Sequence, residues 1–330
     1  MKAVVITRPG GPDVLEVRDV PTPRSAAGEV LVRVMASALN RADVLQREGR
    51  YPAPAGAPAD IPGIEFAGEV AALGPEAGAW RVGQRVFGIT GGGGHAEYLV
   101  APEHTLVEVP ADLGWTEAAA IPEAFITAHD ALWQQAALRA SERVLIHAVG
   151  SGVGLAAVEL VRARGAVPYG TARSQEKIAR AHEYGLEDGV VMRESLDPLA
   201  TRAAEWTSGR GFDVVLDLVG GPYVAASVSA LGLKGRLMLV GTLAGARAEL
   251  DLRAVLGKRL RLIGTVLRAR PLEEKIAATH AFAVEVAPLF AQPKLRAVVD
   301  SEFPLAEIRA AHQRMESNAT FGKVVIRIGE

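Results

Sequence analysis

The segment HAVGSGVGLAA, residues 147–157, decides the fold class of this chain. A short apolar run, Arg143 to His147, leads into it, and a stretch with helical periodicity, Gly152 to Arg164, follows it. A strand, a glycine-rich turn and a helix in this order bring backbone N–H groups and the positive end of a helix dipole to one place. The segment therefore predicts a site for the pyrophosphate of a dinucleotide at the start of an α/β region.

The match to the G-x-G-x-x-G fingerprint is incomplete. When Gly154 is taken as the third glycine, the first two glycine positions carry Val149 and Ser151. A tight strand-to-helix turn that binds no ligand therefore stays open as an alternative. The residues that we expect around the pyrophosphate are Gly150, Ser151, Gly152, Val153 and Gly154.

The end of the next predicted strand, Val167 to Gly170, indicates which dinucleotide binds. An NAD-binding chain usually places Asp or Glu there, where the acid accepts hydrogen bonds from the ribose 2′-OH. Here the strand end has no acid, and cations flank the start of the next helix. Cations at a helix N-terminus oppose its dipole unless an anion binds beside them. The pattern favours NADPH over NAD, with solvated surface cations as the alternative. The expected contacts are Thr171, Arg173, Ser174 and Lys177.

Six predicted strands, separated by helical segments, indicate a doubly wound parallel sheet of the Rossmann type. The first two are the apolar run before the glycine turn and Val167 to Gly170. The other four are Gly189–Val191, Phe212–Asp217, Gly235–Val240 and Leu260–Gly264. We expect this α/β domain to occupy residues 122–270.

The remainder of the chain predicts a β-rich domain. Residues 1–121 contain short β-like runs broken by Gly and Pro, a pattern typical of a small barrel or sandwich. Residues 271–330 contain two helical segments, a strand near Leu295–Val299 and a terminal strand, Lys323–Ile328. A terminal strand needs a partner strand, and the N-terminal region is the natural place for it. We therefore expect residues 1–121 and 271–330 to form one discontinuous domain.

The composition argues against several classes of protein. The chain has no cysteine, which removes disulfides, thiolate catalysis and thiolate zinc sites. Its formal net charge is −2 and no basic cluster is visible, which disfavours nucleic-acid binding. No uncharged apolar stretch reaches the roughly 18 residues of a membrane span, and Met1 to Pro9 resembles a first strand more than a signal peptide. We expect a cytoplasmic protein that does not enter a membrane.

Further segments carry a resemblance to a known family. Besides the glycine turn they are Ala36–Asp43, Pro62–Gly68, Ala118–Pro122 and Val215–Gly221. Over its whole length the chain resembles the zinc-free medium-chain dehydrogenase/reductases, in particular the zeta-crystallin-like branch of quinone oxidoreductases. Leu45–Tyr51 and Ile121–Ala124 are similar to the tumour-suppressor-inducible group of that branch. The resemblance implies a GroES-like fold for the β-rich domain and assembly into a homodimer or homotetramer.

The position of a zinc ligand in metal-dependent relatives is altered here. Zinc alcohol dehydrogenases carry Gly-His-Glu-x-x-Gly, and this chain has Ile64 in place of the histidine, followed by Glu65. Isoleucine cannot bind zinc, and Asp43 and Glu65 alone do not make a credible zinc site. We expect no metal. Hydride transfer to an aldehyde needs charge stabilisation of the kind a Lewis acid supplies, whereas a reduced quinone delocalises its charge over the ring.

These observations and the resemblance predict an NADPH-dependent quinone oxidoreductase that acts on a small-molecule quinone or another conjugated carbonyl compound. One alternative is an NADPH-dependent reductase of enones, alkenals or enoyl thioesters. An alternative of another class is a nucleotide-binding structural or RNA-binding protein.

The resemblance also implies several site residues. Asn40 and Thr127 are expected near the ribose or nicotinamide, and Tyr51 is expected to stack on the acceptor or donate a hydrogen bond to it. Tyr51 and Asn40 are the catalytic candidates. Loops after later strands, and a family region near the cofactor, add Gly241, Thr242, Leu267 and Asn318. Asp217 is expected to cap a turn, and the seven histidines to be structural or exposed.

Overall fold

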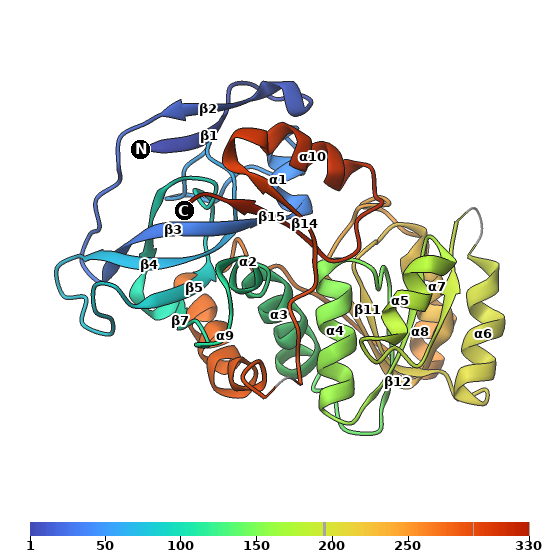
Figure 1. Ribbon diagram of the computed structural model, residues 1–330. Helices are drawn as coiled ribbons and strands as arrows, with labels where there is room; N and C mark the ends of the chain where they lie inside the picture. The colour runs from blue at the N-terminus through green and yellow to red at the C-terminus, as the bar shows by residue number, and fades with distance from the viewer. Residues whose placement is uncertain (194–195, 293, 330) are drawn as a thin grey trace. The chain divides into compact units, whose positions relative to one another are not determined.

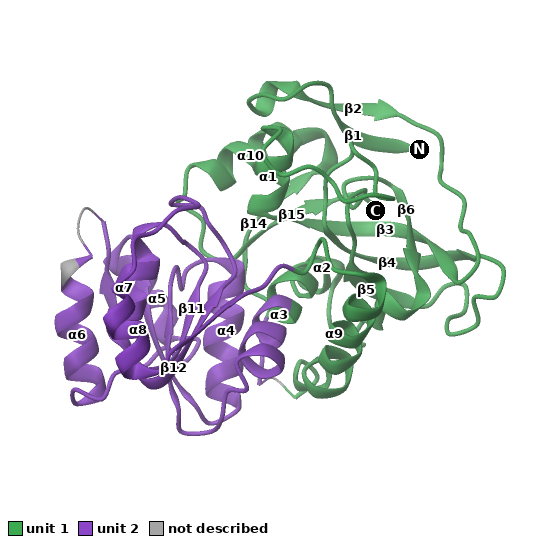
Figure 2. Cartoon of the chain, turned by 180° about the vertical axis from the view of Figure 1, so that it is seen from behind, with its two compact units in different colours: residues 1–126, 267–293, 297–330 green, residues 127–266, 294–296 purple. Residues whose placement is uncertain are grey.

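The computed structural model describes residues 1–193, 196–292 and 294–329. The chain forms two compact units (Figure 2). Unit 1 consists of Met1–Ile126, Leu267–Pro293 and Ala297–Glu330, and unit 2 of Thr127–Val266 and Lys294–Arg296.

Unit 2 is built on a six-stranded parallel sheet in the order β10-β9-β8-β11-β12-β13 (Figure 1). The strands are β8 (Arg143–Ile146), β9 (Val167–Ala172), β10 (Asp188–Val191), β11 (Phe212–Asp217), β12 (Leu231–Leu239) and β13 (Arg261–Gly264). From β8 the chain winds outward to β10, and from β11 it winds the other way to β13. The predicted doubly wound sheet is therefore confirmed, and its switch point lies between the carboxyl ends of β8 and β11.

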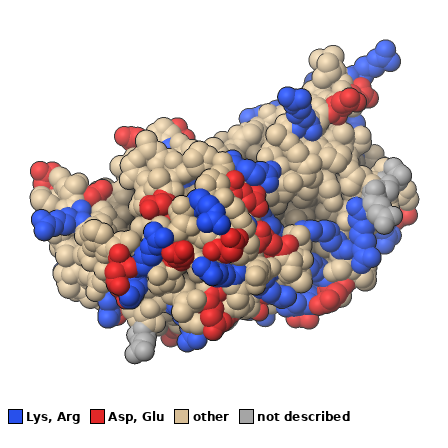
Figure 3. Space-filling model, turned by 90° about the horizontal axis from the view of Figure 1, so that it is seen from above, with Lys and Arg blue, Asp and Glu red and all other residues tan. Residues whose placement is uncertain are grey.

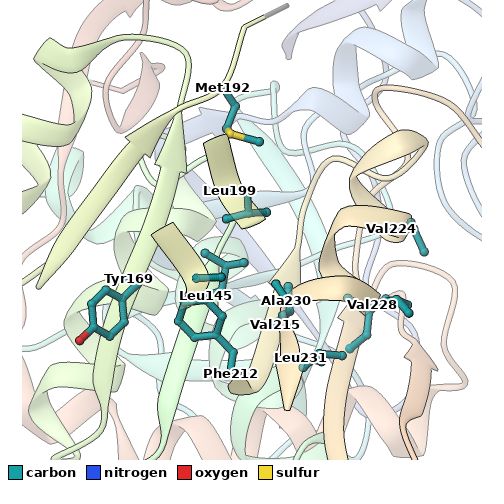
Figure 4. Packing of buried hydrophobic residues seen from close by; sticks show 12 residues of the cluster. Leu145, Tyr169, Met192, Leu199, Phe212, Val215, Val224, Val228, Ala230 and Leu231 are labelled. Atoms are coloured by element: carbon teal, nitrogen blue, oxygen red, sulfur yellow. The ribbon is translucent and has the colours of Figure 1, made fainter. Parts of the chain in front are cut away.

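Helices connect the strands of unit 2. They are α4 (Gly152–Ala163), α5 (Gln175–His182), α6 (Asp197–Thr207), α7 (Pro222–Ala230) and α8 (Leu252–Lys258), and a π-helical turn, η3, spans Asp130–Gln135. Residues of α6 and α7 pack on β8 and β11 in one buried cluster, in which Leu199 and Val228 lie over Leu145 and Phe212 (Figure 4). Right-handed crossovers from a central switch point require such layers on both faces of the sheet.

Unit 1 contains a seven-stranded sheet in the order β14-β15-β3-β4-β5-β7, with β6 also paired to β3, and a separate two-stranded sheet, β1-β2. The strands are β1 (Lys2–Ile6), β2 (Leu15–Asp19), β3 (Glu29–Leu39), β4 (Glu65–Leu73), β5 (Arg85–Ile89), β6 (Tyr98–Pro102), β7 (Leu106–Glu108), β14 (Val299–Pro304) and β15 (Lys323–Arg327). The terminal strand β15 runs antiparallel to β3, with Val324 opposite Leu39. The expected partner of the terminal strand is thus confirmed.

Two strand positions differ from the sequence prediction. The strand expected at Leu295–Val299 begins only at Val299 and continues through polar residues as β14, an edge strand that, among the described residues, pairs with β15. An edge strand has one solvated side, so the exposed Glu302 is tolerated there, and Asp300 accepts hydrogen bonds from Arg314 and from the Phe321 N–H. The apolar pattern therefore misplaces the strand. The sequence run from His95 to Val100 also predicts a strand, but β6 begins only at Tyr98, because His95 lies in an irregular segment whose carbonyl accepts a hydrogen bond from the Val4 N–H.

The helices of unit 1 are α1 (Arg41–Arg47), α2 (Trp115–Ala119), α9 (Leu272–Glu285) and α10 (Ile308–Glu316), and α3 (Pro122–His129) begins in unit 1 and ends in unit 2. Short 3-10 turns are η1 (Pro12–Val14), η2 (Glu103–Thr105), η4 (Ala287–Leu289) and η5 (Leu305–Glu307). None of the described helices is both long and apolar enough to cross a bilayer. On the face in Figure 3, basic and acidic side chains are interspersed.

Candidate nucleotide site and polar cluster

The glycine turn before α4 is held in a conformation that few residues tolerate. Ala148 has a positive φ of 57°, in the left-handed region, and begins the turn. A Cβ atom added to Gly154 would lie 2.3 Å from the carbonyl oxygen of Ala148. The helix thus starts so close to the preceding strand that only glycine fits at position 154.

The two missing glycines of the fingerprint are compensated locally. Val149 is fully buried, and its Cγ1 atom occupies the space that a Cβ on Gly170 of β9 would need, 2.1 Å away. Gly170, on the neighbouring strand, therefore leaves the space that a valine at the first glycine position of the fingerprint needs. Ser151 caps α4: its Oγ accepts a hydrogen bond from the Gly154 N–H at 3.1 Å and donates one to the Ala148 carbonyl at 2.8 Å.

Lys177 lies beside this turn, and Arg173 lies just before the helix α5 that carries Lys177. A Cβ on Gly150 would meet the Cδ of Lys177 at 2.9 Å, so the lysine side chain lies along the turn. Ser174 caps α5 by accepting a hydrogen bond from the Lys177 N–H at 3.3 Å, and the preceding residue, Arg173, is exposed. Backbone donors at a helix N-terminus with a lysine and an arginine beside them fit an anionic dinucleotide.

Thr171, one of the predicted contacts, has a buried side chain. Its hydroxyl lies 3.0 Å from His147 Nδ1, and His147 Nε2 lies 3.0 Å from the Ser227 hydroxyl. Burial lowers the pKa of His147 to about 4, which keeps the imidazole neutral. The hydroxyl of Thr171 therefore stabilises the interior of unit 2, and this residue could meet a ligand only through its backbone.

The turn after β11 carries Asp217 as a cap. One of its oxygens, Oδ1, accepts hydrogen bonds from the N–H groups of Val219 and Gly220, both at 2.8 Å. A Cβ on Gly220 would lie 2.7 Å from the carbonyl oxygen of Gly241 and 2.8 Å from the Cα of Thr242. The predicted residues Gly241 and Thr242 are thus packed on this turn at the carboxyl ends of β11 and β12, where a doubly wound sheet holds its ligand.

A buried ionic network in unit 1 occupies the place of the zinc-ligand motif. The Lys323 ammonium lies 2.6 Å from Glu65 Oε1, and it donates a hydrogen bond to Asn40 Oδ1 at 2.6 Å. The Asn40 amide donates to the same Glu65 oxygen at 2.7 Å. Glu65 is fully buried and Lys323 nearly so, while Ile64 packs in the core.

Both carboxylate oxygens of Asp43 also accept hydrogen bonds from groups of this chain. Asp43 forms a capping box at the start of α1, accepting a hydrogen bond from the Asn40 N–H at 2.7 Å, and its other oxygen accepts one from the Gly63 N–H at 2.9 Å. Among the described residues, no group of three or more His, Cys, Asp or Glu side chains is arranged to hold a metal ion. The donor set does not fit the zinc of the metal-dependent relatives.

Arg268 and Tyr51 form a second polar group in unit 1. Arg268 is nearly buried; it donates hydrogen bonds to Gln46 Oε1 at 2.6 Å and to the Gly91 carbonyl at 2.8 Å. Its guanidinium lies 5.1 Å from the centre of the Tyr51 ring. Tyr51 is half-buried, and burial raises the pKa of its phenol, which therefore stays protonated at neutral pH.

Glu123, which the sequence did not single out, lies between these two groups. Its backbone N–H donates to Glu65 Oε2 at 2.8 Å. Burial, and then the neighbouring Glu65 carboxylate, raise the pKa of Glu123 to about 8, against the opposing effect of Lys323. Arg268 and Glu123 come from segments far apart in the sequence, and no motif marks either of them. Only an acid placed directly after the Ile121-Pro122 pair hinted at a role for this position.

The remaining predicted residues are dispersed over both units. Asn318 has a φ of 58° and its side-chain oxygen accepts a hydrogen bond from Arg41 at 2.8 Å, so it closes the segment after α10. Leu267 is buried beside Arg268 in unit 1, and Thr127 is buried in the part of α3 that belongs to unit 2.

Fold and site together define a class: a medium-chain dehydrogenase/reductase without its zinc ligands. Two family models match the chain, the alcohol dehydrogenase GroES-like domain over residues 26–111 and the zinc-binding dehydrogenase over residues 188–326. A quinone oxidoreductase of Lama guanicoe is 31% identical over 99% of this chain and 97% of its own length. One of Pseudomonas aeruginosa is 34% identical over 96% of each chain. The chain belongs to the quinone oxidoreductase family.

Solved structures agree with this assignment. A mycobacterial protein solved in complex with NADPH has a TM-score of 0.87 and 29% identity, over 99% of this chain and 100% of that one. An enoyl reductase named CurK has a TM-score of 0.86 and 29% identity, over 99% of each chain. The predicted family, and the GroES-like and Rossmann folds, are confirmed.

Proposed function

We propose that the protein is an NADPH-dependent quinone oxidoreductase that passes reducing equivalents from NADPH to a quinone without a metal. The observation that carries the proposal is the network of Glu65, Lys323 and Asn40. Where a metal-dependent relative polarises a carbonyl with zinc, this chain neutralises its acid with its own ammonium group. The acceptor must therefore take up hydride with little Lewis-acid help, as a quinone does.

The cofactor assignment rests on the residues around the glycine turn. The N–H groups at the start of α4 bind the pyrophosphate in this proposal, and Arg173 and Lys177 face the 2′-phosphate. When bound, NADPH supplies the hydride. We assign the nicotinamide end to Asn40, Thr127, Gly241, Thr242, Leu267 and Asn318.

Tyr51 is our candidate for the contact to the acceptor. Its phenol is neutral at physiological pH and its ring is braced by Arg268, so it offers an aromatic face for stacking and an O–H for a hydrogen bond to a carbonyl oxygen. Positioning of this kind supplies much of the rate in reactions that need no covalent help from the protein.

Reduction of an enone or an enoyl thioester is the second candidate, and the likeness to an enoyl reductase favours it. Both quinone and enone reduction begin with hydride transfer, and reduction of an enone or an enoyl thioester leaves an enolate that must take up a proton.

The two activities are distinguished by mixing the enzyme with NADPH or NADH and following the loss of reduced nicotinamide. The acceptors are 9,10-phenanthrenequinone, a simple benzoquinone, an alkenal and crotonyl thioester, with a chelator present throughout.

Rapid oxidation of NADPH by a quinone, slow use of NADH and no effect of the chelator are the expected results. Faster turnover of the alkenal or the thioester would transfer the function to the second candidate. Tight NADPH binding without turnover of any acceptor would indicate a structural or RNA-binding protein instead.

We further propose a homodimer in the cytoplasm that forms through the free edge of the unit 2 sheet. Among the described residues, strand β13 pairs only with β12, and its Leu262 is exposed. Leu252 and Leu256 on the neighbouring helix α8 are 66% and 76% exposed. An unprotected edge strand beside exposed leucines favours pairing with a second copy.

A further inference from the structure

The polar groups of unit 1 that surround Glu123 form two tiers. The buried tier consists of Asp43, Glu65, Lys323 and Arg268, each at most 5% exposed. The accessible tier consists of Tyr51, Glu123 and Lys275, all partly exposed. Each of these groups acts electrostatically on Glu123 or is acted on by it. They come from the loop after α1, the sheet, the three helices α1, α3 and α9, and the segment before α9, so the arrangement is a product of the fold.

Within this arrangement Glu123 is the carboxyl that is partly exposed, whereas Asp43 and Glu65 are both fully buried. The oxygens of Asp43 and Glu65 accept hydrogen bonds from N–H groups, an amide and an ammonium. The backbone N–H of Glu123 donates to Glu65 Oε2 at 2.8 Å, which places the start of α3 beside the buried tier.

We propose that Glu123 is the catalytic acid that protonates the reduced acceptor, while Tyr51 holds the acceptor by stacking or hydrogen bonding. This inference rests on the proposed function. It identifies the group that completes the reaction, to which neither the motif nor the resemblance assigned a role.

When bound, NADPH would supply a hydride: its nicotinamide C–H bond would break as a new O–H bond forms at one quinone oxygen, and the two electrons would leave an oxyanion at the other oxygen. The O–H bond of the Glu123 carboxylic acid breaks, a new O–H bond forms on that oxygen, and hydroquinone results. The Glu123 carboxylate then regains a proton from water.

Among the three accessible groups, Glu123 is best suited to this exchange. An acid works best when its pKa lies near the working pH, because it is then largely protonated yet gives up its proton readily. The pKa of Glu123 is raised to about 8, whereas that of the Tyr51 phenol is raised above its usual value near 10. Burial, and then Arg268, lower the pKa of Lys275, and its ammonium provides a positive charge near the acid.

The test compares wild type with E123Q, E123D and the control E117Q, which removes an exposed carboxyl in the first turn of the preceding helix α2. Glutamine keeps the shape of Glu123 but has no proton to transfer. We expect E123Q to lower kcat with a quinone by ~10²-fold or more and to abolish the fall of kcat above the pKa of Glu123. E123D restores part of the rate, and E117Q matches wild type. NADPH affinity, measured by fluorescence titration, is unchanged in all four proteins.

A second readout does not depend on turnover. The infrared C=O stretch of a protonated carboxylic acid is followed from pH 5 to 10 in wild type minus E123Q. We expect a band that disappears with a midpoint near the pKa of Glu123. If that band is absent at neutral pH, or if E123Q keeps the rate and the pH profile of wild type, the role of Glu123 is overturned. If wild type reduces no quinone at any pH, the proposed function itself fails, and the role of Glu123 fails with it.

Discussion

The ammonium of Lys323, in the last strand of the sheet of unit 1, lies 2.6 Å from the carboxylate of Glu65, in β4, and both side chains are buried. Two buried charges of this kind are stable only as a pair, because each has lost its hydration. The pair also joins β15 to the segment that would carry a zinc ligand in metal-dependent relatives. The positive charge that balances the Glu65 carboxylate therefore comes from Lys323 of the same chain.

Removal of this ammonium should destabilise the protein strongly. We expect K323M to lower the free energy of unfolding by ~3–5 kcal/mol, because Glu65 would remain buried without its partner. The surface pair of Lys2 and Asp19 provides a matched control, since its N–O distance is also 2.6 Å but both side chains are exposed. K2M should change stability little. Chemical denaturation of both variants measures the difference, and equal effects would contradict this account.

The two cations beside the glycine turn should set the preference for NADPH. We expect K177A and R173A each to raise KM for NADPH by about 10-fold or more, because one charge-assisted hydrogen bond to a phosphate contributes ~1.5–3 kcal/mol. KM for NADH should stay nearly constant. R180A removes a cation of the same helix, α5, which is exposed and outside the predicted contacts, and serves as the control. A parallel loss of affinity for both nucleotides would argue against a 2′-phosphate site.

Gly154 should tolerate no side chain. A Cβ atom there would lie 2.3 Å from the Ala148 oxygen and 2.9 Å from the Val149 Cα, which are both backbone atoms. We expect G154A to destabilise the protein by ~1–3 kcal/mol and to abolish NADPH binding. Gly257, in α8, has open space around a Cβ, so G257A should stabilise by ~0.5–1 kcal/mol. Thermal unfolding and NADPH titration measure both, and unaltered binding in G154A would show that the turn is not the nucleotide site.

A buried acid in unit 2 should make stability depend on pH. Burial raises the pKa of Glu159 from 4.5 to about 8, against a hydrogen bond from the Arg296 N–H. The folded state therefore binds a proton that the unfolded chain has released, and unfolding free energy falls between pH 4.5 and 8 by up to ~1.4 kcal/mol per pH unit. E159Q should reduce this slope and E187Q, an exposed control, should not. Urea titrations from pH 4 to 9 measure the slopes.

The free edge of the unit 2 sheet should determine assembly. We expect L262K, alone or with L256K, to convert the protein into monomers, because a charge on the edge strand or its neighbouring helix blocks pairing. Val82, which is 65% exposed in unit 1, provides the control V82K. Analytical ultracentrifugation measures the mass, and an unchanged oligomer in L262K would move the interface elsewhere.

Local patterns were sufficient to predict the alternation of strands and helices in unit 2, because most of its strands are apolar and glycines lie near many of their ends. They failed at β14, whose polar residues lie at a sheet edge. The strand, glycine turn and helix of the candidate nucleotide site were predicted although the first glycine of the fingerprint is replaced, but the sequence did not show why the replacement is tolerated. Val149 is tolerated because Gly170, in another strand, makes room for it. Such a compensation appears only when neighbouring strands are placed side by side.

The candidate site was predicted less completely for the same reason. Tyr51 and Asn40 were predicted as candidates because they lie in segments that resemble the family. Glu123, Arg268 and Lys323 gain their significance from what surrounds them, which is fixed by the pairing of β15 with β3 and by buried hydrogen bonds. No spacing rule connects residues 40, 123, 268 and 323, and the pKa of an acid depends on burial that the sequence does not show.

The antiparallel pairing of β15 with β3 has a consequence for synthesis on the ribosome. Unit 2 has all its strands available once residue 264 has emerged, and domains generally fold as units in the order in which they appear. The first residues of unit 1 emerge before unit 2, but the charge of Glu65 is not neutralised until Lys323 has been synthesised. The N-terminal segment of unit 1, Met1–Ile126, is therefore made first but is among the last parts of the nascent chain to reach its native state.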